Sequence, residues 1–144
     1  MKILDFLNPD AITLDLQGST KKEIITELVN LLAKAKKIKS PEKIAQSLLE
    51  REKLGSTGIG QGIAIPHGKS DLISEIVAAF GISKKGTEFD AFDDEPVYLI
   101  FLLVAPPDAA GAHLKALARI SRLLKDKFFR QSLRNATSVD EIIR

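Results

Sequence analysis

The chain has 144 residues, no cysteine and a formal net charge of +2, from 21 Lys and Arg against 19 Asp and Glu. A chain of this length is expected to form one domain that buries about two-thirds of its unfolded surface. The small charge imbalance argues against binding to nucleic acid or to an anionic membrane surface. The absence of cysteine excludes disulfide and thiol chemistry within these residues.

Neither apolar stretch of the chain is expected to insert into a membrane. The run from Val97 to Ala105 is less than half of the about 20 residues that a membrane helix needs, and it predicts a buried strand instead. Residues 1–10 have one lysine, an aspartate within the apolar stretch and no small-residue cleavage site, which is unlike a signal peptide. The simplest expectation is a cytoplasmic location.

A strand followed by a helix with a capping box is predicted at the start of the chain. Ile12, Leu14 and Leu16 alternate with polar residues, which predicts a short half-buried strand. Thr20 followed by Glu23 three residues later is typical of a helix start. The apolar stripe of this helix, which we expect to face the core, consists of Ile24, Leu28, Leu31, Leu32 and Ala35.

A second helix is predicted from Ser40 as N-cap and Pro41 at the first helical position. Gly55 ends this helix and leaves Arg51 in its last turn, where the helix dipole favours a cation. The inward face of the helix is expected to consist of Ile44, Ala45, Leu48 and Leu49.

The second half of the chain continues the alternation of strands and helices. Residues 75–82 predict a strand, 84–96 a turn-rich connection, and 97–104 a strand buried on both faces. Interleaved strands and amphipathic helices predict an α/β fold, a single domain over residues 1–144 with a mixed β-sheet covered by helices on both faces.

After a proline-rich break, a helix is predicted that carries His113 in its first turn. Its expected apolar stripe is Leu114, Leu117, Ile120, Leu123 and Leu124. Helical pieces at 128–133 and 138–143 follow, the latter with Ser138 and Glu141 as a capping box. The basic residues of this region are interpreted as a solvated face, with an anion-binding patch as the alternative: Arg119, Arg122, Lys125, Lys127, Arg130 and Arg134.

The segment GSTGIGQGIAIPHGKSD contains the first candidate functional residue. Gly58, Gly60 and Gly62 alternate, a pattern that lets a backbone turn sharply and approach another group closely. The segment lacks the Lys-Ser/Thr of a P-loop and does not open a helix as a dinucleotide fingerprint would. His67 follows Pro66, so it lies on a rigid rim where another molecule can reach it. On glycine spacing alone, a loop histidine without a role explains the segment equally well.

The second histidine favours a binding function. His113 follows the break after a buried strand, where α/β folds hold anionic ligands, so both histidines and Arg51 can converge on one phosphate-sized charge. A zinc site is the competing interpretation, since Asp71 and Asp108 would complete the ligand set. The spacing is unlike an H-E-x-x-H helix or a cysteine-based site, so we expect no metal.

The run REKLGSTGIGQGIAIPHGKSD, followed by GTEFDAFDDEPVYLIFLLVAPPDAAGAHLKALARISRLLKD, resembles the enzyme IIA components of the bacterial sugar phosphotransferase system, of fructose, mannitol and nitrogen-regulatory type. The resemblance covers essentially the whole chain, and GIAIPH with an upstream arginine and a downstream HLKAL is a specific combination. It implies that His67 accepts a phosphoryl group from the histidine phosphocarrier protein and passes it to a cysteine of an enzyme IIB component. Arg51 and His113 match the positions that stabilise this group.

These residue types suit phosphoryl transfer. A neutral imidazole is nucleophilic at cytoplasmic pH, and the transition state chiefly needs positioning and charge neutralisation. Arg51 can supply a bidentate fork and His113 one N–H, with no metal or cofactor beyond a covalent phosphohistidine. Further backbone donors are expected from a phosphoryl-binding loop of Thr57, Gly58, Gly60 and Gly62.

The absence of cysteine also bears on the partners. The IIB acceptor is expected to be a separate polypeptide, through which the protein associates with a membrane IIC component. GKSD after the histidine and EFDAFDDEPVYLIFLLVAP resemble fructose-type more than mannitol-type members, which predicts fructose-type sugar uptake. Nitrogen-regulatory members share much of this pattern, so the alternative is a regulatory protein whose phosphorylation state controls a binding partner.

Overall fold

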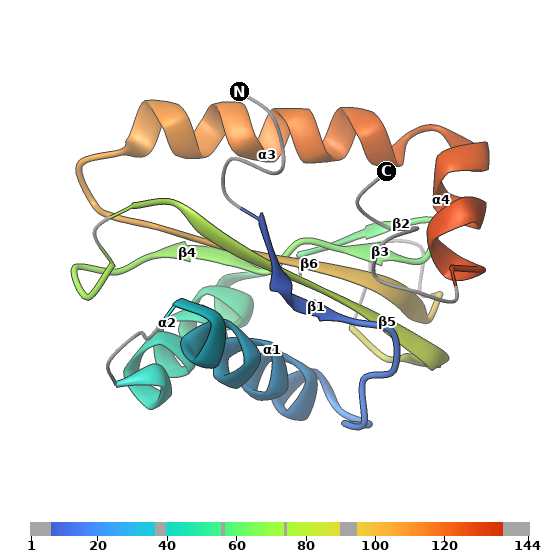
Figure 1. Cartoon of the computed structure of the whole chain (residues 1–144), viewed down its shortest axis with the longest axis horizontal. Helices are drawn as coiled ribbons and strands as arrows, with labels where there is room; N and C mark the ends of the chain where they lie inside the picture. The colour runs from blue at the N-terminus through green and yellow to red at the C-terminus, as the bar shows by residue number, and fades with distance from the viewer. Residues whose placement is uncertain (1–6, 37–39, 56, 74, 90–94, 137–144) are drawn as a thin grey trace.

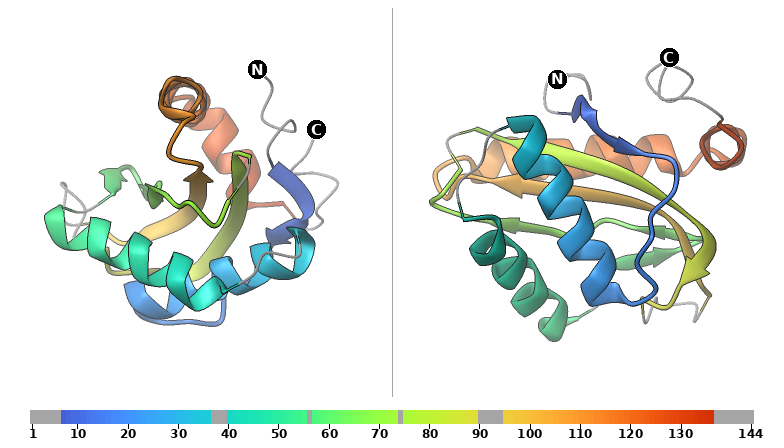
Figure 2. Two further views of the ribbon diagram at one scale, coloured as in Figure 1. Left: turned by 90° about the vertical axis from the view of Figure 1, so that its left-hand side faces the viewer. Right: turned by 60° about the horizontal axis from the view of Figure 1, so that its bottom comes forward.

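The structure is a computed structural model that describes residues 7–36, 40–55, 57–73, 75–89 and 95–136. Within them a six-stranded mixed sheet lies between α1 and α2 on one face and α3 on the other (Figures 1 and 2). This arrangement confirms the predicted α/β fold class. In chain order the elements are β1 (Leu7–Thr13), α1 (Lys21–Lys36), α2 (Pro41–Leu54), β2 (Gly58–Gly60), β3 (Ile63–Ala64), β4 (His67–Lys69), β5 (Val77–Thr87), β6 (Val97–Ala105), α3 (Ala110–Leu124) and α4 (Lys127–Arg134).

The sheet is built around β6. Its strand order is β1-β5-β6-β3-β2, with β5 antiparallel to β6, and β3 and β4 both parallel to the other edge of β6. Ile63 lies opposite Leu99 and His67 opposite Leu103, so β3 and β4 follow one line along β6. Between them Pro66 has no N–H to donate, and its carbonyl accepts from the Leu103 N–H. The two strands therefore form one interrupted strand, and His67 begins its second piece.

The core lies on both faces of the sheet. In β6, Ile100, Leu102 and Val104 pack toward α1 and α2, whereas Leu99, Phe101 and Leu103 pack toward α3 and α4. This alternation confirms that the strand is buried on both faces. Each such side chain stabilises the fold by roughly 1.5–3 kcal/mol. None of the described helices combines the length and the apolar character needed to cross a bilayer.

The predicted start of α1 is confirmed in detail. Thr20 Oγ1 accepts the Glu23 N–H and Glu23 Oε1 accepts the Thr20 N–H, each at 3.1 Å, which is the reciprocal geometry of a capping box. Of the predicted stripe, Leu31 and Ala35 are only half-buried, whereas Ile25 and Val29 are fully buried. The buried face is wider than the stripe because α1 packs against the sheet and also against α2.

The start of α2 differs from the prediction in its mechanism. Ser40 occupies the N-cap position, but its φ of 54° is left-handed and its side chain makes no capping hydrogen bond. Pro41 therefore provides the helix-start signal, through its fixed φ. At the other end, the Gly55 N–H donates to Glu52 O, and Arg51 lies in the last turn as predicted.

Both predicted strand boundaries around β1 and β5 are shifted. β1 ends at Thr13, before Leu14 and Leu16, although the Leu16 N–H still donates to Ile82 O at 2.9 Å. The turn-rich connection predicted from residue 84 is wrong at its start, because β5 continues to Thr87. A hydrogen bond of 2.9 Å between the Ser83 and Thr87 hydroxyls accompanies this irregular continuation.

The C-terminal helices largely follow the prediction. α4 covers the predicted helical piece, whereas 138–143 lies outside the described residues. In α3 the predicted stripe is wrong at Leu114, which is 69% exposed, while Ala116 is buried. Two of the basic residues of this region make contacts within the chain: Arg130 donates to the carbonyls of Leu124 and Lys125, and Arg134 stacks on Tyr98.

Candidate functional site

His67 lies where the interrupted strand resumes beside β6. Side chains alternate across a strand, so Ile63, Ile65 and His67 point to the face that α3 covers. The Nδ1 atom of His67 lies 2.7 Å from Ile65 O. Because a carbonyl oxygen only accepts, Nδ1 carries the proton in the neutral ring, and Nε2 keeps its lone pair. The local backbone thus leaves Nε2 as the ring nitrogen with a free lone pair.

Gly68 is explained by packing on the opposite face. A Cβ atom at this position would lie 3.1 Å from Leu48 Cδ2 of α2, which is closer than ordinary contact. The Ser47 hydroxyl also donates to Lys69 O at 3.4 Å. The glycine after His67 therefore lets α2 lie directly against β4, and this places the end of α2 beside the histidine strand.

His113 lies beside His67, as the sequence predicted. Its ring centroid is 5.7 Å from that of His67, with the two ring planes at 76°. Only 5% of His113 is exposed, and its buried Nε2 has no hydrogen-bond partner in the described part of the chain. Burial, followed by electrostatic repulsion from His67 and Lys69, lowers the pKa of His113 below its ordinary value. An unpaired buried nitrogen of this kind calls for a partner, and it lies next to the candidate nucleophile.

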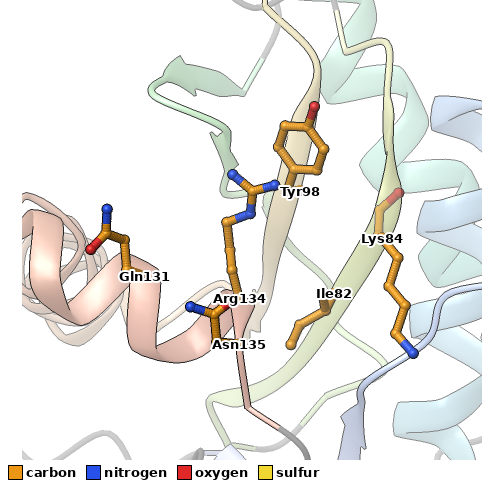
Figure 3. A pocket seen from close by; sticks show the side chains of 7 residues that line it. Ile82, Lys84, Tyr98, Gln131, Arg134 and Asn135 are labelled. Carbon is orange, nitrogen blue, oxygen red and sulfur yellow. The ribbon is translucent and has the colours of Figure 1, made fainter.

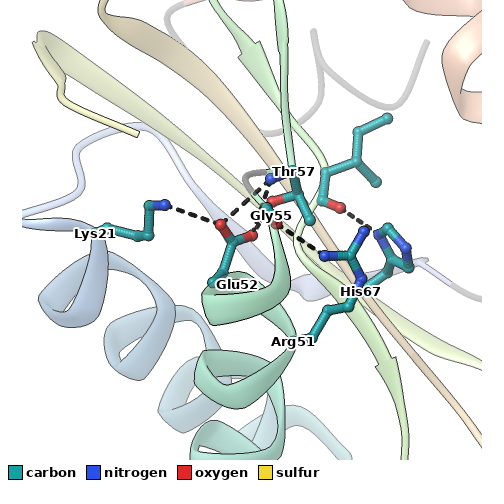
Figure 4. Close-up of polar contacts among 7 residues, drawn as sticks. Lys21, Arg51, Glu52, Gly55, Thr57 and His67 are labelled. Carbon is teal, nitrogen blue, oxygen red and sulfur yellow. Dashed lines mark hydrogen bonds and ion pairs between the residues drawn. The ribbon is translucent and has the colours of Figure 1, made fainter. Parts of the chain in front are cut away.

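Arg51 reaches the site from the last turn of α2. Its Nη1 donates to Gly55 O at 2.8 Å. Figure 4 shows the guanidinium of Arg51 directed toward His67. The ion pair found among the described residues joins Lys21 to Glu52, so Arg51 has no carboxylate partner there. Its charge is therefore available to an anion near His67.

Glu52 is a buried residue of the site region that sequence reasoning missed. Its carboxylate accepts the Thr57 N–H at 3.2 and 3.3 Å, the Thr57 hydroxyl, and Lys21 Nζ at 3.0 Å (Figure 4). A signal was present in the sequence, because Glu52 continues the buried stripe of α2 four residues after Leu48. A carboxylate on an apolar stripe predicts a buried polar contact.

The glycines of the predicted phosphoryl-binding loop shape a β-hairpin. Gly58 begins β2, the turn passes through positive φ at Gly60 (90°), Gln61 (58°) and Gly62 (80°), and the Gly62 carbonyl accepts N–H groups from the start of β6. The residue after this turn pairs with β6 four residues before the partner of His67, which is roughly 13 Å along the strand. Thr57 is closer to the histidine segment, but its N–H and hydroxyl both donate to Glu52.

Other candidate sites receive little support. No three His, Asp or Glu side chains gather as a metal site in the described residues, which include all four members of the zinc alternative. A hollow of about 360 Å³ lies between the other end of β6 and α4. Figure 3 shows that Lys84 and Gln131 on its wall extend to opposite sides, with Arg134 against Tyr98. Its polar groups therefore do not converge on one ligand.

Comparison with known families gives a match over nearly the whole chain. A family described as "Phosphoenolpyruvate-dependent sugar phosphotransferase system, EIIA 2" matches residues 5–144. The chain is 39% identical over 143 residues to the fructose-specific EIIABC component of Bacillus subtilis, covering 99% of this chain but 22% of that protein. It is 40% identical over 144 residues to the nitrogen regulatory protein of Bradyrhizobium diazoefficiens, covering 99% of this chain and 92% of that one.

Solved structures give a corresponding match in fold. The nitrogen regulatory protein IIA-Ntr of Neisseria meningitidis superposes with a TM-score of 0.90 and 37% identity, over 97% of this chain and 95% of that one. The mannitol enzyme IIA of Escherichia coli, in its complex with phosphorylated enzyme IIB, superposes with a TM-score of 0.81 and 27% identity, over 94% and 93% of the two chains.

Proposed function

The chain belongs to the EIIA 2 family of the phosphoenolpyruvate-dependent sugar phosphotransferase system, and we propose that it is a phosphohistidine relay of fructose-type sugar uptake. It accepts a phosphoryl group on His67 from the histidine phosphocarrier protein and passes the group to a cysteine of an enzyme IIB component. One observation supports this most directly. The ring of His67, with its proton on Nδ1, lies against the ring of His113, whose buried Nε2 has no hydrogen-bond partner among the described residues. Members of this family carry the group as covalent phosphohistidine and need no cofactor.

In the accepting step the lone pair on His67 Nε2 attacks the phosphorus atom of the donor phosphohistidine. An N–P bond forms at Nε2 while the donor P–N bond breaks, and its electron pair returns to the donor ring. The proton stays on Nδ1, and its hydrogen bond to Ile65 O stabilises the positive charge that the substituted ring gains. In the hand-off a cysteine thiolate attacks phosphorus, an S–P bond forms, and the electron pair of the breaking N–P bond returns to Nε2.

The remaining site residues neutralise charge during this transfer. The transition state spreads negative charge over three equatorial oxygens, so positioned donors supply most of the catalysis. His113, whose pKa is lowered by burial and so favours the neutral ring, donates one N–H from Nε2, and Arg51 supplies a charged planar fork. Neither role requires a metal.

Exposed apolar side chains near the site favour docking of partner proteins. Leu54 follows Arg51 by three residues and is 86% exposed, and Leu114 directly follows His113. Ile59 and Leu72 are also exposed large hydrophobic residues. Contiguous exposed apolar patches mark interaction surfaces, and we expect these residues to contribute to one. The Escherichia coli mannitol enzyme IIA, a structural relative, is known in complex with phosphorylated enzyme IIB. We expect the relay to work in the cytoplasm and to reach a membrane IIC component through IIB.

Phosphorylation of the purified chain tests this function. Phosphoenolpyruvate with the general phosphotransferase proteins should place one acid-labile, base-stable phosphate on the protein, and His67→Ala should remove it completely. A fructose-type IIB component should then receive the phosphate. Acid-stable phosphate, or labelling that persists in His67→Ala, would exclude the proposed nucleophile.

A nitrogen-regulatory function is the second candidate. It is favoured by the 40% identity over 92% of the Bradyrhizobium nitrogen regulatory protein and by the fold match to IIA-Ntr. In that case His67 is still phosphorylated, but its phosphorylation state controls binding to a partner. Efficient transfer to IIB supports sugar uptake, whereas a stable phosphoprotein that transfers nothing to IIB supports regulation.

A further inference from the structure

Glu52 is a buried carboxylate for which the phosphoryl-transfer scheme has no direct use. Its side chain is 4% exposed and lies at the end of α2, next to Arg51. We propose that Glu52 is a positioning residue that holds His67 in its reactive tautomer. The proposal rests on the proposed function for its reaction. Its geometry comes from a continuous series of hydrogen bonds.

The first part of the series joins Glu52 to Thr57. The carboxylate accepts both the backbone N–H and the hydroxyl of Thr57, so two donors of one residue are held by one group. Lys21 Nζ contacts Glu52 Oε2 at 3.0 Å, which balances the buried charge and fixes the carboxylate from the α1 side. Thr57 itself is 4% exposed, so water does not replace these contacts.

The second part joins Thr57 to the nucleophile. The Thr57 carbonyl accepts the Ile65 N–H at 3.0 Å, and the Ile65 carbonyl accepts Nδ1–H of His67 at 2.7 Å. Thr57 is therefore held at its N–H by Glu52 and at its C=O by Ile65. A displacement of Thr57 moves the carbonyl that binds the His67 proton. The carbonyl that accepts from Arg51 belongs to Gly55, two residues before Thr57 in the chain.

The tautomer matters because a protonated Nε2 has no lone pair for attack on phosphorus. If the Ile65 carbonyl moves away, the proton exchanges freely between the two ring nitrogens, and the fraction of reactive rings falls. A misplacement of about 1 Å also costs up to roughly 100-fold in rate, even when it begins away from the reacting atoms.

Three variants test this path. Glu52→Gln keeps the shape, but its NH₂ group cannot accept a hydrogen bond and its neutral amide cannot pair with Lys21, so the set of contacts with Thr57 and Lys21 cannot be kept whole. Thr57→Val keeps the backbone contact and the volume of the side chain but removes the hydroxyl. The matched control is Glu50→Gln on the same helix, where an exposed Glu50 accepts only a surface bond from Gln46 in the described residues.

Two measurements are made on each variant after denaturant unfolding confirms that it is folded. Long-range ¹H–¹⁵N spectra of the imidazole ring report the tautomer of His67, with its signals assigned by their absence in His67→Ala. Single-turnover phosphorylation gives the rate. Glu52→Gln should lower both the Nδ1–H population and the rate, the rate by roughly 10- to 100-fold. Thr57→Val should shift both less, and Glu50→Gln should match the wild type.

Three results would contradict the positioning role of Glu52. A rate loss with an unchanged tautomer, or no change in either measurement, would overturn the proposal. The double variant Glu52→Gln/Thr57→Val should lose less activation free energy than the sum of the losses in the two single variants, because both substitutions act on the contact between Glu52 and Thr57. Additive losses would also overturn the proposal. If the wild-type protein accepts no phosphate at all, the proposed function fails, and the tautomer shift in Glu52→Gln still decides the positioning role.

Discussion

The rings of His67 and His113 meet edge to face, with centroids 5.7 Å apart, although one belongs to an interrupted strand and the other to the first turn of α3. Their meeting depends on the alternation of β4, which turns His67 toward the face that α3 covers. The pair defines the centre of the candidate site.

His113→Ala should slow phosphorylation without abolishing it. The variant removes one preorganised N–H donor but leaves Nε2 of His67 as nucleophile, so a loss on the order of 10² to 10³ in single-turnover rate is expected. His67→Ala should show no transfer at all. A fully inactive His113→Ala together with an active His67→Ala would reverse the two roles.

Arg51→Lys should slow transfer by roughly 10- to 100-fold, because one charge-assisted hydrogen bond contributes about 1.5–3 kcal/mol and lysine cannot form the planar fork. Lysine keeps the positive charge, so measurable activity should remain. Quench-flow phosphorylation measures this loss, with Lys53→Arg as a matched control, because Lys53 is exposed and lies two residues further along the same helix. Equal rates for Arg51→Lys and the wild type would mean that charge alone is sufficient.

Stability should fall with decreasing pH because of His113. Burial and nearby positive charge lower the pKa of His113 in the folded state below the ordinary value of 6.5. As the pH falls below about 6.5, His113 binds a proton in the unfolded chain before it does so in the folded chain. The free energy of unfolding therefore decreases, by at most about 1.4 kcal/mol per pH unit. Chemical denaturation at several pH values should show a smaller decrease in His113→Gln. An identical pH dependence in both proteins would contradict this assignment.

Gly81→Ala should destabilise the fold by about 1–3 kcal/mol, since a Cβ atom would lie 2.6 Å from Leu16 Cδ1 and 2.8 Å from its Cγ. Leu16 is buried where the chain passes from β1 to α1, so it has little room to move. Adding Leu16→Ala should recover part of the loss relative to Leu16→Ala alone. Urea unfolding of the four proteins of this cycle measures the coupling.

Leu114→Ser should weaken docking while leaving the chemistry intact. Its side chain is 69% exposed beside His113, so its removal should raise the KM for the phosphocarrier roughly 5- to 30-fold at an unchanged saturating rate. Phe128→Ser is the control, because Phe128 is 78% exposed on α4, away from the histidine strand. Equal effects of the two substitutions would indicate a general loss of surface hydrophobicity rather than a docking site.

Much of this arrangement could be predicted from local sequence. The capping box at Thr20 and the doubly buried β6 follow from short-range rules, and the order of elements then defines the fold class. The two histidines could be singled out from their positions after Pro66 and after the proline-rich break. The sequence alone could not show that Nδ1 of His67 is bound to Ile65, since that depends on how the strand is interrupted.

The differences come from tertiary contacts. Leu114 continues a helical stripe but follows His113 on α3, where the described structure leaves it exposed. The stripe of α2 ends on Glu52 because a carboxylate there is satisfied by Thr57 and Lys21, residues from other parts of the chain. Gly60 and Gly62 suggested an anion loop, but their positive φ values serve a hairpin turn.

The contact between Gly68 and Leu48 has an evolutionary consequence. A Cβ atom at position 68 would lie only 3.1 Å from Leu48 Cδ2. A side chain at position 68 and a large side chain at position 48 therefore compete for the same space between β4 and α2. The two positions should therefore covary. A relative with alanine at the position of Gly68 is expected to carry a residue smaller than leucine at the position of Leu48. This exchange would preserve the packing of α2 against the strand that carries His67.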